Sequence, residues 1–346
     1  MNSFSAVIIR WFRENGRDLP WRETKDPYAI WLSEIILQQT RIVQGWEYWE
    51  RFMQTYPKVE DLAAASEDDV LKLWQGLGYY SRARNLHAAA KQIVALGSFP
   101  NTLDGIKSLK GVGDYTAAAI GSFAFDIPAA VVDGNVYRVL SRYFGIDTPI
   151  NSTQGKKEFA ALAQSLLPAS DAASYNQGMM DFGAIQCTPQ SPKCLLCPLA
   201  ETCEALRCGR VEELPVKNKT VKVKTRHLSY IYIRCKSSVA DGAGNTEPMV
   251  AIHRRGEGDI WQGLWEPYNI SDVKELPSFV KNPILLAKDV KHVLTHRILL
   301  ADFYLLETET CPQLPDDYIW IKESEIEDYG VPRLIEIMLE KINPAE

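Results

Sequence analysis

The sequence predicts an α+β protein of two domains, an all-helical domain followed by a smaller domain of strands with one terminal helix. Residues 1–208 place apolar side chains at helical spacing in one segment after another, whereas residues 227–346 show the alternation of apolar and polar side chains that is typical of strands. Residues 209–226 are polar, rich in lysine and interrupted by Pro215, which indicates a linker. The chain has 346 residues, of which 46% are hydrophobic, so it is long enough for two cores.

Four segments of the first domain carry the clearest helical signals. In residues 26–43, Asp26 is a suitable N-cap and Pro27 fits the first helical position. Three further segments end at glycines or carry one apolar stripe at helical spacing: residues 68–78, 82–97 and 134–145. In the second domain, strands are expected at residues 228–235, 249–255 and 298–307, and a helix at residues 332–341.

Four cysteines with the spacing C-x6-C-x2-C-x5-C predict a metal centre, and they are Cys187, Cys194, Cys197 and Cys203. Three prolines among them exclude a helix interior or a central strand, so a metal would have to organise the segment. Two disulfides and a zinc ion are the alternatives, but nothing in the sequence looks secreted, and zinc sites usually come as two short-spaced pairs separated by a longer gap. The uneven spacing favours a [4Fe–4S] cluster. The remaining cysteines are expected to be ordinary thiols.

The composition limits the partners of the chain. The net charge is −6, so there is no global basic field, and any contact with DNA must use local patches. The first residues contain no apolar run long enough for a signal peptide, and no segment reaches the roughly 20 apolar residues that span a membrane. A protein of the reducing cytoplasm is therefore expected.

A second motif is the turn Gly111-Val112-Gly113, which is expected between a helix that ends near Lys110 and one that starts near Asp114. Glycines let the backbone approach a partner closely, and the amides at a helix start can hold a phosphate. This is the helix–hairpin–helix pattern of DNA-binding proteins, and a plain tight turn is the alternative. Twenty residues beyond Gly113, an apolar run leads to Asp133 at the start of another helix.

The hairpin, the downstream aspartate and the cysteine loop, in this order, resemble the endonuclease III superfamily of base-excision DNA glycosylases. The closer resemblance is to the adenine DNA glycosylase (MutY-type) family, through WLSEIILQQT (31–40), GLGYYSRARNL (76–86), GVGDYTA (111–117) and DGNVYRV (133–139). It implies a helix–hairpin–helix glycosylase domain over residues 1–208, with a [4Fe–4S] loop at 187–203, and a Nudix-like α/β domain over residues 227–346. It also implies a monomeric, nucleoid-associated repair enzyme that removes adenine opposite 8-oxoguanine or guanine from double-stranded DNA.

Two carboxylates are the candidate catalytic pair. Glu34 lies among apolar residues such as Ile30 and Trp31, and such surroundings raise the pKa of a carboxyl so that it can protonate a leaving base near neutral pH. Asp133 is placed to stabilise the cationic sugar that forms when a glycosidic bond breaks. The alternatives are a solvated glutamate on an amphipathic helix and an aspartate that serves only as an N-cap. By resemblance, Glu34 protonates N7 of adenine.

Two further residues are assigned by resemblance: Tyr115 stands beside the sugar, and Asn135 orients water and Glu34. Bifunctional members of the superfamily carry a lysine at position 115, which forms an imine with the sugar and permits strand cleavage. A tyrosine cannot form an imine, so a monofunctional glycosylase is expected. A bifunctional enzyme of the endonuclease III type and a non-catalytic iron–sulfur DNA-binding protein are the alternative functions.

The resemblance also assigns residues that contact DNA in the helical domain. Gln39 and Tyr79 match residues that insert into the duplex when a base is flipped out, and Arg82 adds a cation beside the tyrosine. Trp21 and Arg22 match residues that line the adenine pocket.

In the second domain, Thr295 and His296 match a Phe-Ser-His loop that recognises 8-oxoguanine in the family. Leu294 stands where the family has the aromatic residue, so this position offers no aromatic ring to stack against the lesion. An ordinary histidine at a strand edge is the alternative for His296. The glutamate cluster with which catalytic Nudix enzymes hold divalent metal is absent after Glu266, so nucleotide hydrolysis is not expected.

Overall fold

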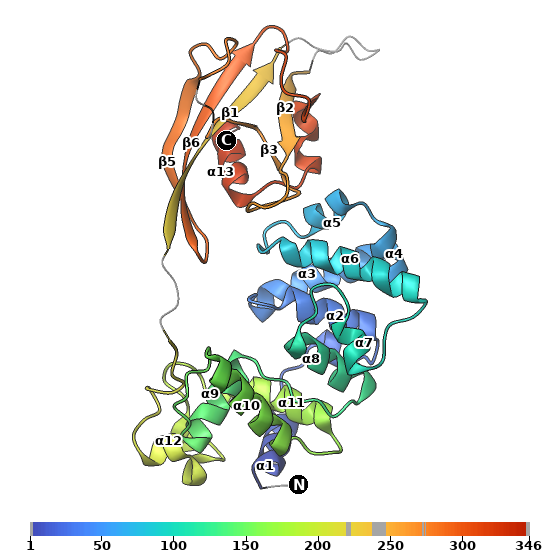
Figure 1. Ribbon diagram of the computed structural model, residues 1–346, viewed down its shortest axis with the longest axis vertical. Helices are drawn as coiled ribbons and strands as arrows, with labels where there is room; N and C mark the ends of the chain where they lie inside the picture. Colours follow the sequence, from blue (N-terminus) through green and yellow to red (C-terminus); the bar gives the residue numbers. More distant parts are fainter. Residues whose placement is uncertain (1–2, 219–222, 237–246, 272, 274, 344–346) are drawn as a thin grey trace. The chain divides into compact units, whose positions relative to one another are not determined.

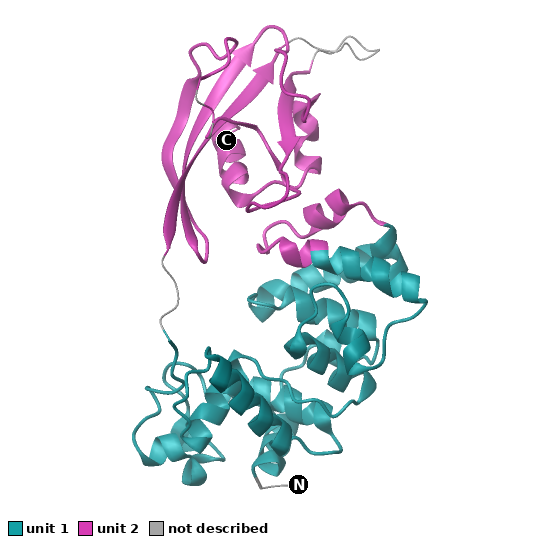
Figure 2. Cartoon of the chain, viewed as in Figure 1, with its two compact units in different colours: residues 1–64, 85–219 teal, residues 65–84, 220–346 magenta. Residues whose placement is uncertain are grey.

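The computed structural model describes residues 3–218, 223–236, 247–271, 273 and 275–343. The chain forms two compact units, one of residues 1–64 and 85–219 and the other of residues 65–84 and 220–346 (Figure 2). None of the described helices is both long enough and apolar enough to cross a membrane.

The first unit is built of helices (Figure 1). Its α-helices are α1 (Ser3–Asn15), α2 (Pro27–Ile36), α3 (Ile42–Thr55), α4 (Val59–Ala64), most of α6 (Ser81–Leu96), α7 (Leu103–Lys107), α8 (Asp114–Phe125), α9 (Gly134–Phe144), α10 (Thr153–Leu166), α11 (Ala172–Asp181) and α12 (Glu204–Arg207). Four short turns of other helix types complete it: η1 (Pro20–Arg22), the π-helical η2 (Phe182–Gln186), η3 (Cys194–Leu196) and η4 (Ala200–Thr202).

The long helix expected over residues 26–43 is wrong in its second half. Asp26 caps α2 as predicted, because its side chain accepts the backbone N–H of Tyr28 at 3.0 Å. However, α2 ends at Ile36, and the backbone at Gln39 is left-handed, with φ of +58°. α3 begins only at Ile42, and its Gly45 has no Cβ where the side chain of Leu37 packs. The break brings the residues that follow Leu37 out of the helix and into a loop.

Helices α1, α9, α10 and α11 share one core. Its fully buried members include Ile8, Leu140 and Phe159, and Phe182 from η2 packs with them. The apolar stripe predicted for residues 134–145 supplies three of these buried positions: Val136, Val139 and Leu140. This core fixes the start of α9, and therefore Asp133.

The second unit is a mixed sheet with helices (Figure 1). Its elements are α5 (Glu67–Leu73), β1 (Lys224–Cys235), β2 (Met249–Arg254), β3 (Trp265–Glu266), β4 (Tyr268–Asn269), β5 (Ile284–Val293), β6 (Arg297–Thr308), β7 (Tyr318–Lys322), η5 (Glu323–Asp328) and α13 (Arg333–Ile342). The strand order is β3-β2-β1-β6-β5, with β4 paired to β1 and β7 paired to β2. β1 and β6 are parallel, from Lys224 opposite Arg297 to Cys235 opposite Thr308, and the other pairs are antiparallel.

The three predicted strands and the terminal helix are present, although β1 begins inside the expected linker. Earlier linker residues pack against the helical unit, since Leu214 is buried and its carbonyl accepts a hydrogen bond from Arg142 at 3.0 Å. α13 contributes Leu334 and Met338 to a core that it shares with Phe303 of β6.

Residues 65–84 lie in the segment that the sequence assigns to the helical domain, but they bond to β2, to β3 and to the loop between these strands. Arg254 donates to the carboxylate of Glu67 at 2.8 Å. Arg84 donates to the carbonyl of Gln262 at 2.6 Å, and the indole of Trp265 donates to Asp68 at 3.3 Å. These bonds explain why the segment belongs to the second unit.

Candidate active site and metal centre

Glu34 lies on the last turn of α2 and is only 7% exposed. Burial raises its pKa to about 7, because a carboxylate loses its hydration there. The hydroxyl of Tyr115 donates to its Oε2 at 2.9 Å and opposes that shift, whereas the charge of Asp133 adds to it. Glu34 is thus a carboxyl that can hold a proton near neutral pH.

Asp133 is the N-cap of α9. One carboxylate oxygen accepts the backbone N–H groups of Asn135 and Val136 at 2.8 and 2.7 Å, and the other accepts the side-chain amide of Asn135 at 2.8 Å. Burial raises the pKa of Asp133, and these three donors oppose the shift. The capping role and an electrostatic role are therefore compatible in one residue.

Asn135 is held between two groups. Its amide donates to Asp133, and its carbonyl oxygen accepts a hydrogen bond from Arg138 at 2.8 Å. Arg138 also donates to the backbone carbonyl of Gly183 in η2. A Cβ at Gly183 would lie 2.5 Å from the Cβ of Asn135, so the glycine allows η2 to approach the start of α9. In the described structure, the amide of Asn135 therefore orients Asp133. The family resemblance instead predicts that Asn135 orients Glu34 and water.

Glu34, Asp133, Tyr115 and Asn135 line one cavity of about 220 Å³, so the structure brings the four predicted catalytic residues together. Trp21 and Arg22 line the same cavity. A purine base needs such a concave site with few, fixed polar groups.

Sequence reasoning missed the anchor of Arg22. Asp181 at the end of α11 is fully buried, and both of its oxygens accept from Arg22 at 2.8 Å. Its carboxylate also accepts the backbone N–H of Arg17 at 2.9 Å. Gln177, one helical turn before Asp181, and Met180, which directly precedes it, line the cavity as well. The signal that would reveal Gln177 and Met180 is their i, i+3 spacing, which puts both side chains on one face of α11.

The hairpin glycines lie as the sequence predicts between α7 and α8, although α7 ends at Lys107, three residues before the expected position. Gly111 is left-handed, with φ of +78°, and a Cβ there would lie 2.7 Å from the Cβ of Asn85. Gly113 faces open space, and a Cβ at this N-cap of α8 would meet no atom within 4 Å. Buried Val112 anchors the turn between them. The arrangement leaves the amides at the start of α8 accessible.

The four predicted cysteine ligands line one cavity. In the part of the chain that the structure describes, no three His, Cys, Asp or Glu side chains lie close enough to hold a single metal ion. A zinc ion with Zn–S bonds of about 2.3 Å would need the sulfurs much closer together than a cluster of several irons does. Four cysteines on one cavity are a ligand set of the kind that holds an iron–sulfur cluster.

Buried Arg142 organises this cysteine loop. It donates to the carbonyls of Thr188 and Pro189 at 2.7 and 3.0 Å and approaches the sulfur of Cys187 at 3.4 Å. Burial raises the pKa of the Cys197 thiol to about 11, and the pKa values of Cys194 and Cys203 are raised for the same reason. Thiolates at these positions therefore need a bound cation, as metal ligation provides.

The predicted DNA-inserting residues Gln39 and Tyr79 share a backbone feature: both are left-handed, with φ of +58° and +49°. Both side chains are exposed. Arg82 is buried instead, and its guanidinium donates to the carbonyl of Gly78 at 3.3 Å and lies 5.6 Å from the ring centroid of Tyr79. Arg82 thus supports the turn that carries Tyr79.

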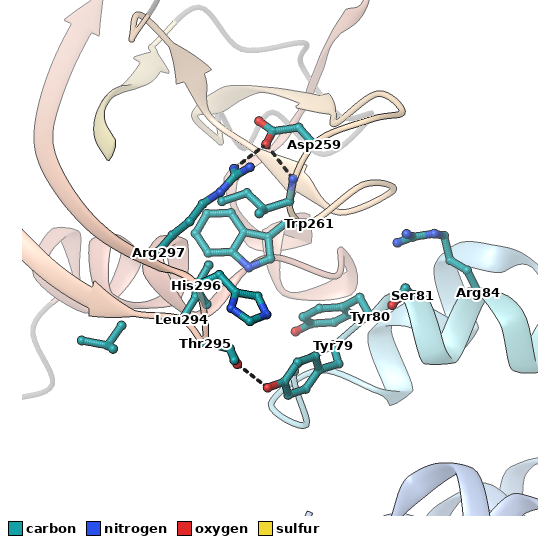
Figure 3. A pocket seen from close by; sticks show the side chains of 13 residues that line it. Tyr79, Tyr80, Ser81, Arg84, Asp259, Trp261, Leu294, Thr295, His296 and Arg297 are labelled. Atoms are coloured by element: carbon teal, nitrogen blue, oxygen red, sulfur yellow. Dashed lines mark hydrogen bonds and ion pairs between the residues drawn. The ribbon is translucent and has the colours of Figure 1, made fainter. Parts of the chain in front are cut away.

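Within the second unit, Thr295 and His296 lie in the tight turn between β5 and β6, which is closed by Leu294 N–H donating to Arg297 at 2.8 Å. Both side chains are exposed and line a pocket of about 520 Å³ together with Tyr79 and Trp261 (Figure 3). The hydroxyls of Thr295 and Tyr79 form a hydrogen bond. The structure thus places a predicted DNA-inserting residue and the predicted lesion-reading pair on one pocket.

Comparison with known proteins assigns the family. The adenine DNA glycosylase of Buchnera aphidicola subsp. Schizaphis graminum is 31% identical over 350 residues, which cover 97% of this chain and 98% of that protein. The chain belongs to the adenine DNA glycosylase family. The human adenine DNA glycosylase is 40% identical over 225 residues, which cover 62% of this chain and 41% of the human protein.

Family models and solved structures extend the assignment. Residues 32–168 match the HhH-GPD superfamily of base excision DNA repair proteins, residues 187–203 match the iron–sulfur binding domain of endonuclease III, and residues 244–341 match the NUDIX domain. A thermostable thymine-DNA glycosylase is 34% identical with a TM-score of 0.56, and it covers 59% of this chain and 95% of its own length. An endonuclease III trapped on DNA, 22% identical with a TM-score of 0.52, shares the fold over 59% of this chain and 94% of its own length. The predicted fold class, the glycosylase assignment and the iron–sulfur segment are confirmed.

Proposed function

We propose that this chain removes adenine from double-stranded DNA where it is mispaired with 8-oxoguanine or guanine, and that it hydrolyses only the N-glycosidic bond. The observation that carries this proposal is the pair of Glu34, with a pKa of about 7, and Asp133 on one cavity. Glycosidic cleavage needs a proton for the leaving group and a negative charge for the sugar. Burial raises the pKa of both carboxyls, but three N–H donors favour the charged form of Asp133, whereas one phenol bonds Glu34.

Glu34 supplies the proton. Adenine is a poor leaving group as an anion, and protonation at N7 lets it leave as a neutral base. A buried carboxyl of raised pKa holds that proton near neutral pH and releases it to a base bound against it. The hydroxyl of Tyr115, which donates to Oε2 of Glu34, fixes the orientation of the carboxyl.

Asp133 supplies the charge. Three N–H groups point at its oxygens, and such donors favour the ionised form and hold it in one orientation. A carboxylate fixed in this way stabilises an oxocarbenium-like sugar without having to reorganise during the reaction. The same three bonds fix Asp133 as the cap of α9, so the helix and the site depend on one side chain.

Position 115 supports hydrolysis without strand cleavage. An imine with the sugar requires an amine, and the phenol of Tyr115 offers none. Burial raises the pKa of Tyr115 well above its ordinary value, so the hydroxyl stays protonated and acts as a hydrogen-bond donor.

DNA binding is assigned to local features, because the net charge is −6. The open amides at Gly113 and the start of α8 suit a phosphate. Gln39 and Tyr79, both exposed on left-handed turns, are suited to insert where adenine is flipped out.

Thr295 and His296 are assigned to the base opposite adenine. Oxidation at C8 turns N7 of guanine from an acceptor into an N–H donor, and a threonine hydroxyl can accept from it. In the described structure that hydroxyl bonds to Tyr79, so the lesion would replace this partner. His296 lines the same pocket beside it.

The cysteine loop is assigned to a [4Fe–4S] cluster held by Cys187, Cys194, Cys197 and Cys203. Four cysteines that line one cavity, in a segment that matches the iron–sulfur binding domain of endonuclease III, support this choice over zinc. The cluster would supply the cation that keeps the four sulfurs ionised and the loop closed.

The test is incubation of the purified protein with a duplex that contains A opposite 8-oxoguanine, followed by hot alkali. Cleavage at the adenine only after alkali is the expected result. Glu34→Gln should bind the duplex but lose adenine removal, because the amide keeps the shape and has no acidic proton. Strand cleavage before alkali, with an adduct trapped by borohydride, would contradict the monofunctional assignment. Activity of Glu34→Gln within a few-fold of wild type would contradict Glu34 as the acid.

A further inference from the structure

We infer that Trp261 provides the stacking surface for the oxidised guanine in the pocket formed with Tyr79, Thr295 and His296. This inference rests on the proposed function of that pocket. It starts from a missing group: Leu294 stands where the resembling family has an aromatic residue, and this leucine lines the pocket but has no π-face to stack on a base. A purine held by hydrogen bonds alone would leave its π-faces without a partner. The described pocket contains a tryptophan from a different loop.

The backbone of Trp261 is the first evidence for a role. Its φ is +61°, a left-handed conformation that is strained for a bulky side chain and costs on the order of 1–3 kcal/mol. Apart from Trp261 and Tyr79, the described non-glycine residues with a left-handed backbone have smaller or polar side chains. They are Gln39, Asp126, Asp171, Ser191, Asn282 and Asp289. Tyr79 and Trp261 are thus the two strained aromatic residues, and both line the same pocket. Strain of this kind is kept where it positions a functional group.

The loop that carries Trp261 is firmly built. It joins β2 to β3 and is closed by Arg255 N–H donating to Leu264 at 2.8 Å and Gly263 N–H donating to Arg255 at 2.9 Å. The carbonyl of Trp261 accepts the N–H of Leu264 at 3.0 Å. Buried Arg255 donates to the carbonyl of Ile260 at 2.9 Å, and its guanidinium lies 5.8 Å from the ring centroid of Trp261.

An ion pair connects this loop to the lesion-reading turn. Asp259 accepts from Arg255 at 2.8 Å and from Arg297 at 3.2 Å, and Arg297 directly follows His296. Figure 3 shows this bond and shows the indole of Trp261 on the same side of the pocket as His296, with Tyr79 and Tyr80 entering from the segment before α6. Trp261 and the Thr295 hydroxyl are therefore held in a fixed relation, as a ring that stacks on a hydrogen-bonded base requires.

These contacts predict how the pocket distinguishes 8-oxoguanine from guanine. Guanine has no N–H at N7 for Thr295 to accept, so only the oxidised base is retained in the pocket. Stacking on Trp261 then strengthens the binding of A:8-oxoguanine and hardly changes that of A:G. Base–aromatic stacking corresponds to a factor of about 5 to 150 in affinity.

The test uses the full-length chain with Trp261→Leu, Trp261→Phe and the control Trp320→Leu. Trp320 lies in β7, packs against a separate apolar cluster of the sheet and does not line the pocket. Dissociation constants and single-turnover rates are measured on A:8-oxoguanine and A:G duplexes at one salt concentration, with folding checked by circular dichroism. Trp261→Leu should lower the preference for A:8-oxoguanine about tenfold or more, and Trp261→Phe should stay within about threefold of wild type.

Two outcomes overturn the inference. The first is an unchanged preference in Trp261→Leu while Thr295→Ala/His296→Ala loses preference, which would mean that the pocket reads the lesion without the indole. The second is an equal loss in Trp320→Leu, which would mean that the effect comes from packing of the domain. If Thr295→Ala/His296→Ala also leaves the preference unchanged, the proposed function of the pocket fails, and the inference fails with it.

Discussion

At the scale of single residues, the decisive property is the difference between two buried carboxyls. Glu34 accepts one hydrogen bond, from a phenol, and its pKa rises to about 7. Asp133 accepts three N–H donors, which oppose the effect of burial. The apolar neighbours of Glu34 predict the first environment from sequence alone, and the position of Asp133 before α9 predicts its capping bonds. The bond from Tyr115 to Glu34 joins residues 81 positions apart, so only a resemblance or a structure brings them together.

The pKa of Glu34 predicts how the reaction depends on pH. The acid must carry its proton to act, so the single-turnover rate of adenine removal should be highest below pH 7 and fall as pH rises through about 7. The measurement is the rate on one duplex from pH 5.5 to 9 at constant ionic strength. A control with pre-bound DNA separates this effect from loss of binding. A rate that stays constant to pH 9 would show that another group donates the proton.

The raised pKa of Glu34 also predicts a loss of folding stability at high pH. An unfolded glutamate ionises near 4.5 and Glu34 at about 7, so between these values the folded state holds more protons than the unfolded state, and stability falls as pH rises. Above pH 7 the loss is on the order of 3 kcal/mol. Glutamine has no charge to bury and can still accept from Tyr115. Glu34→Gln should therefore melt at a higher temperature than wild type at pH 8, with a smaller difference at pH 5, as measured by circular dichroism.

At the scale of elements, boundaries depend on contacts that lie far away in sequence. Asp26 and Pro27 correctly predict the start of α2, but the apolar pattern through residue 43 conceals its end at Ile36. The break follows from Leu37 packing over Gly45 in α3, a tertiary contact. β5 was not predicted, because register shifts between Leu285 and Ala287 and between Ala287 and Val290 disrupt its alternation. Segments with a strong side-chain period, such as α9 and β6, were predicted correctly, because their pattern is local in the sequence.

The cysteine loop gives a prediction at this scale, because little secondary structure holds it. Cys194→Ser or Cys197→Ser should lose the visible absorption of an iron–sulfur cluster and weaken DNA binding, since the metal closes the loop. Cys208→Ser is the matched control, because Cys208 is exposed and does not line the cysteine cavity. It should keep both absorption and affinity. A colourless wild-type protein with about one zinc per chain would contradict the cluster assignment.

At the scale of the whole molecule, the compact units do not follow the order of the sequence. The composition and the change of periodicity predict two domains, but not that residues 65–84 group with residues 220–346. The reason is a set of side-chain bonds, among them Arg84 to Gln262 and Arg254 to Glu67, that no local pattern reveals. Tyr79 belongs to this segment, so a residue proposed to insert into DNA shares a unit with the proposed lesion reader.

This grouping predicts the effect of removing residues 219–346. The cavity of Glu34 and Asp133 and the cysteine loop lie in the other unit, so the truncated protein should keep its cluster absorption and some adenine removal. It should lose its preference for A:8-oxoguanine over A:G, and it should bind both duplexes more weakly, because the segment that carries Tyr79 loses its partners.

Tyr79→Phe in the full-length chain separates the two effects, since it removes only the hydroxyl that bonds Thr295. Single-turnover rates and dissociation constants on both duplexes, at one salt concentration, are the measurement. If truncation weakens binding but leaves the preference intact, lesion reading lies in the helical unit, and the placement of Thr295 and His296 at the lesion is wrong.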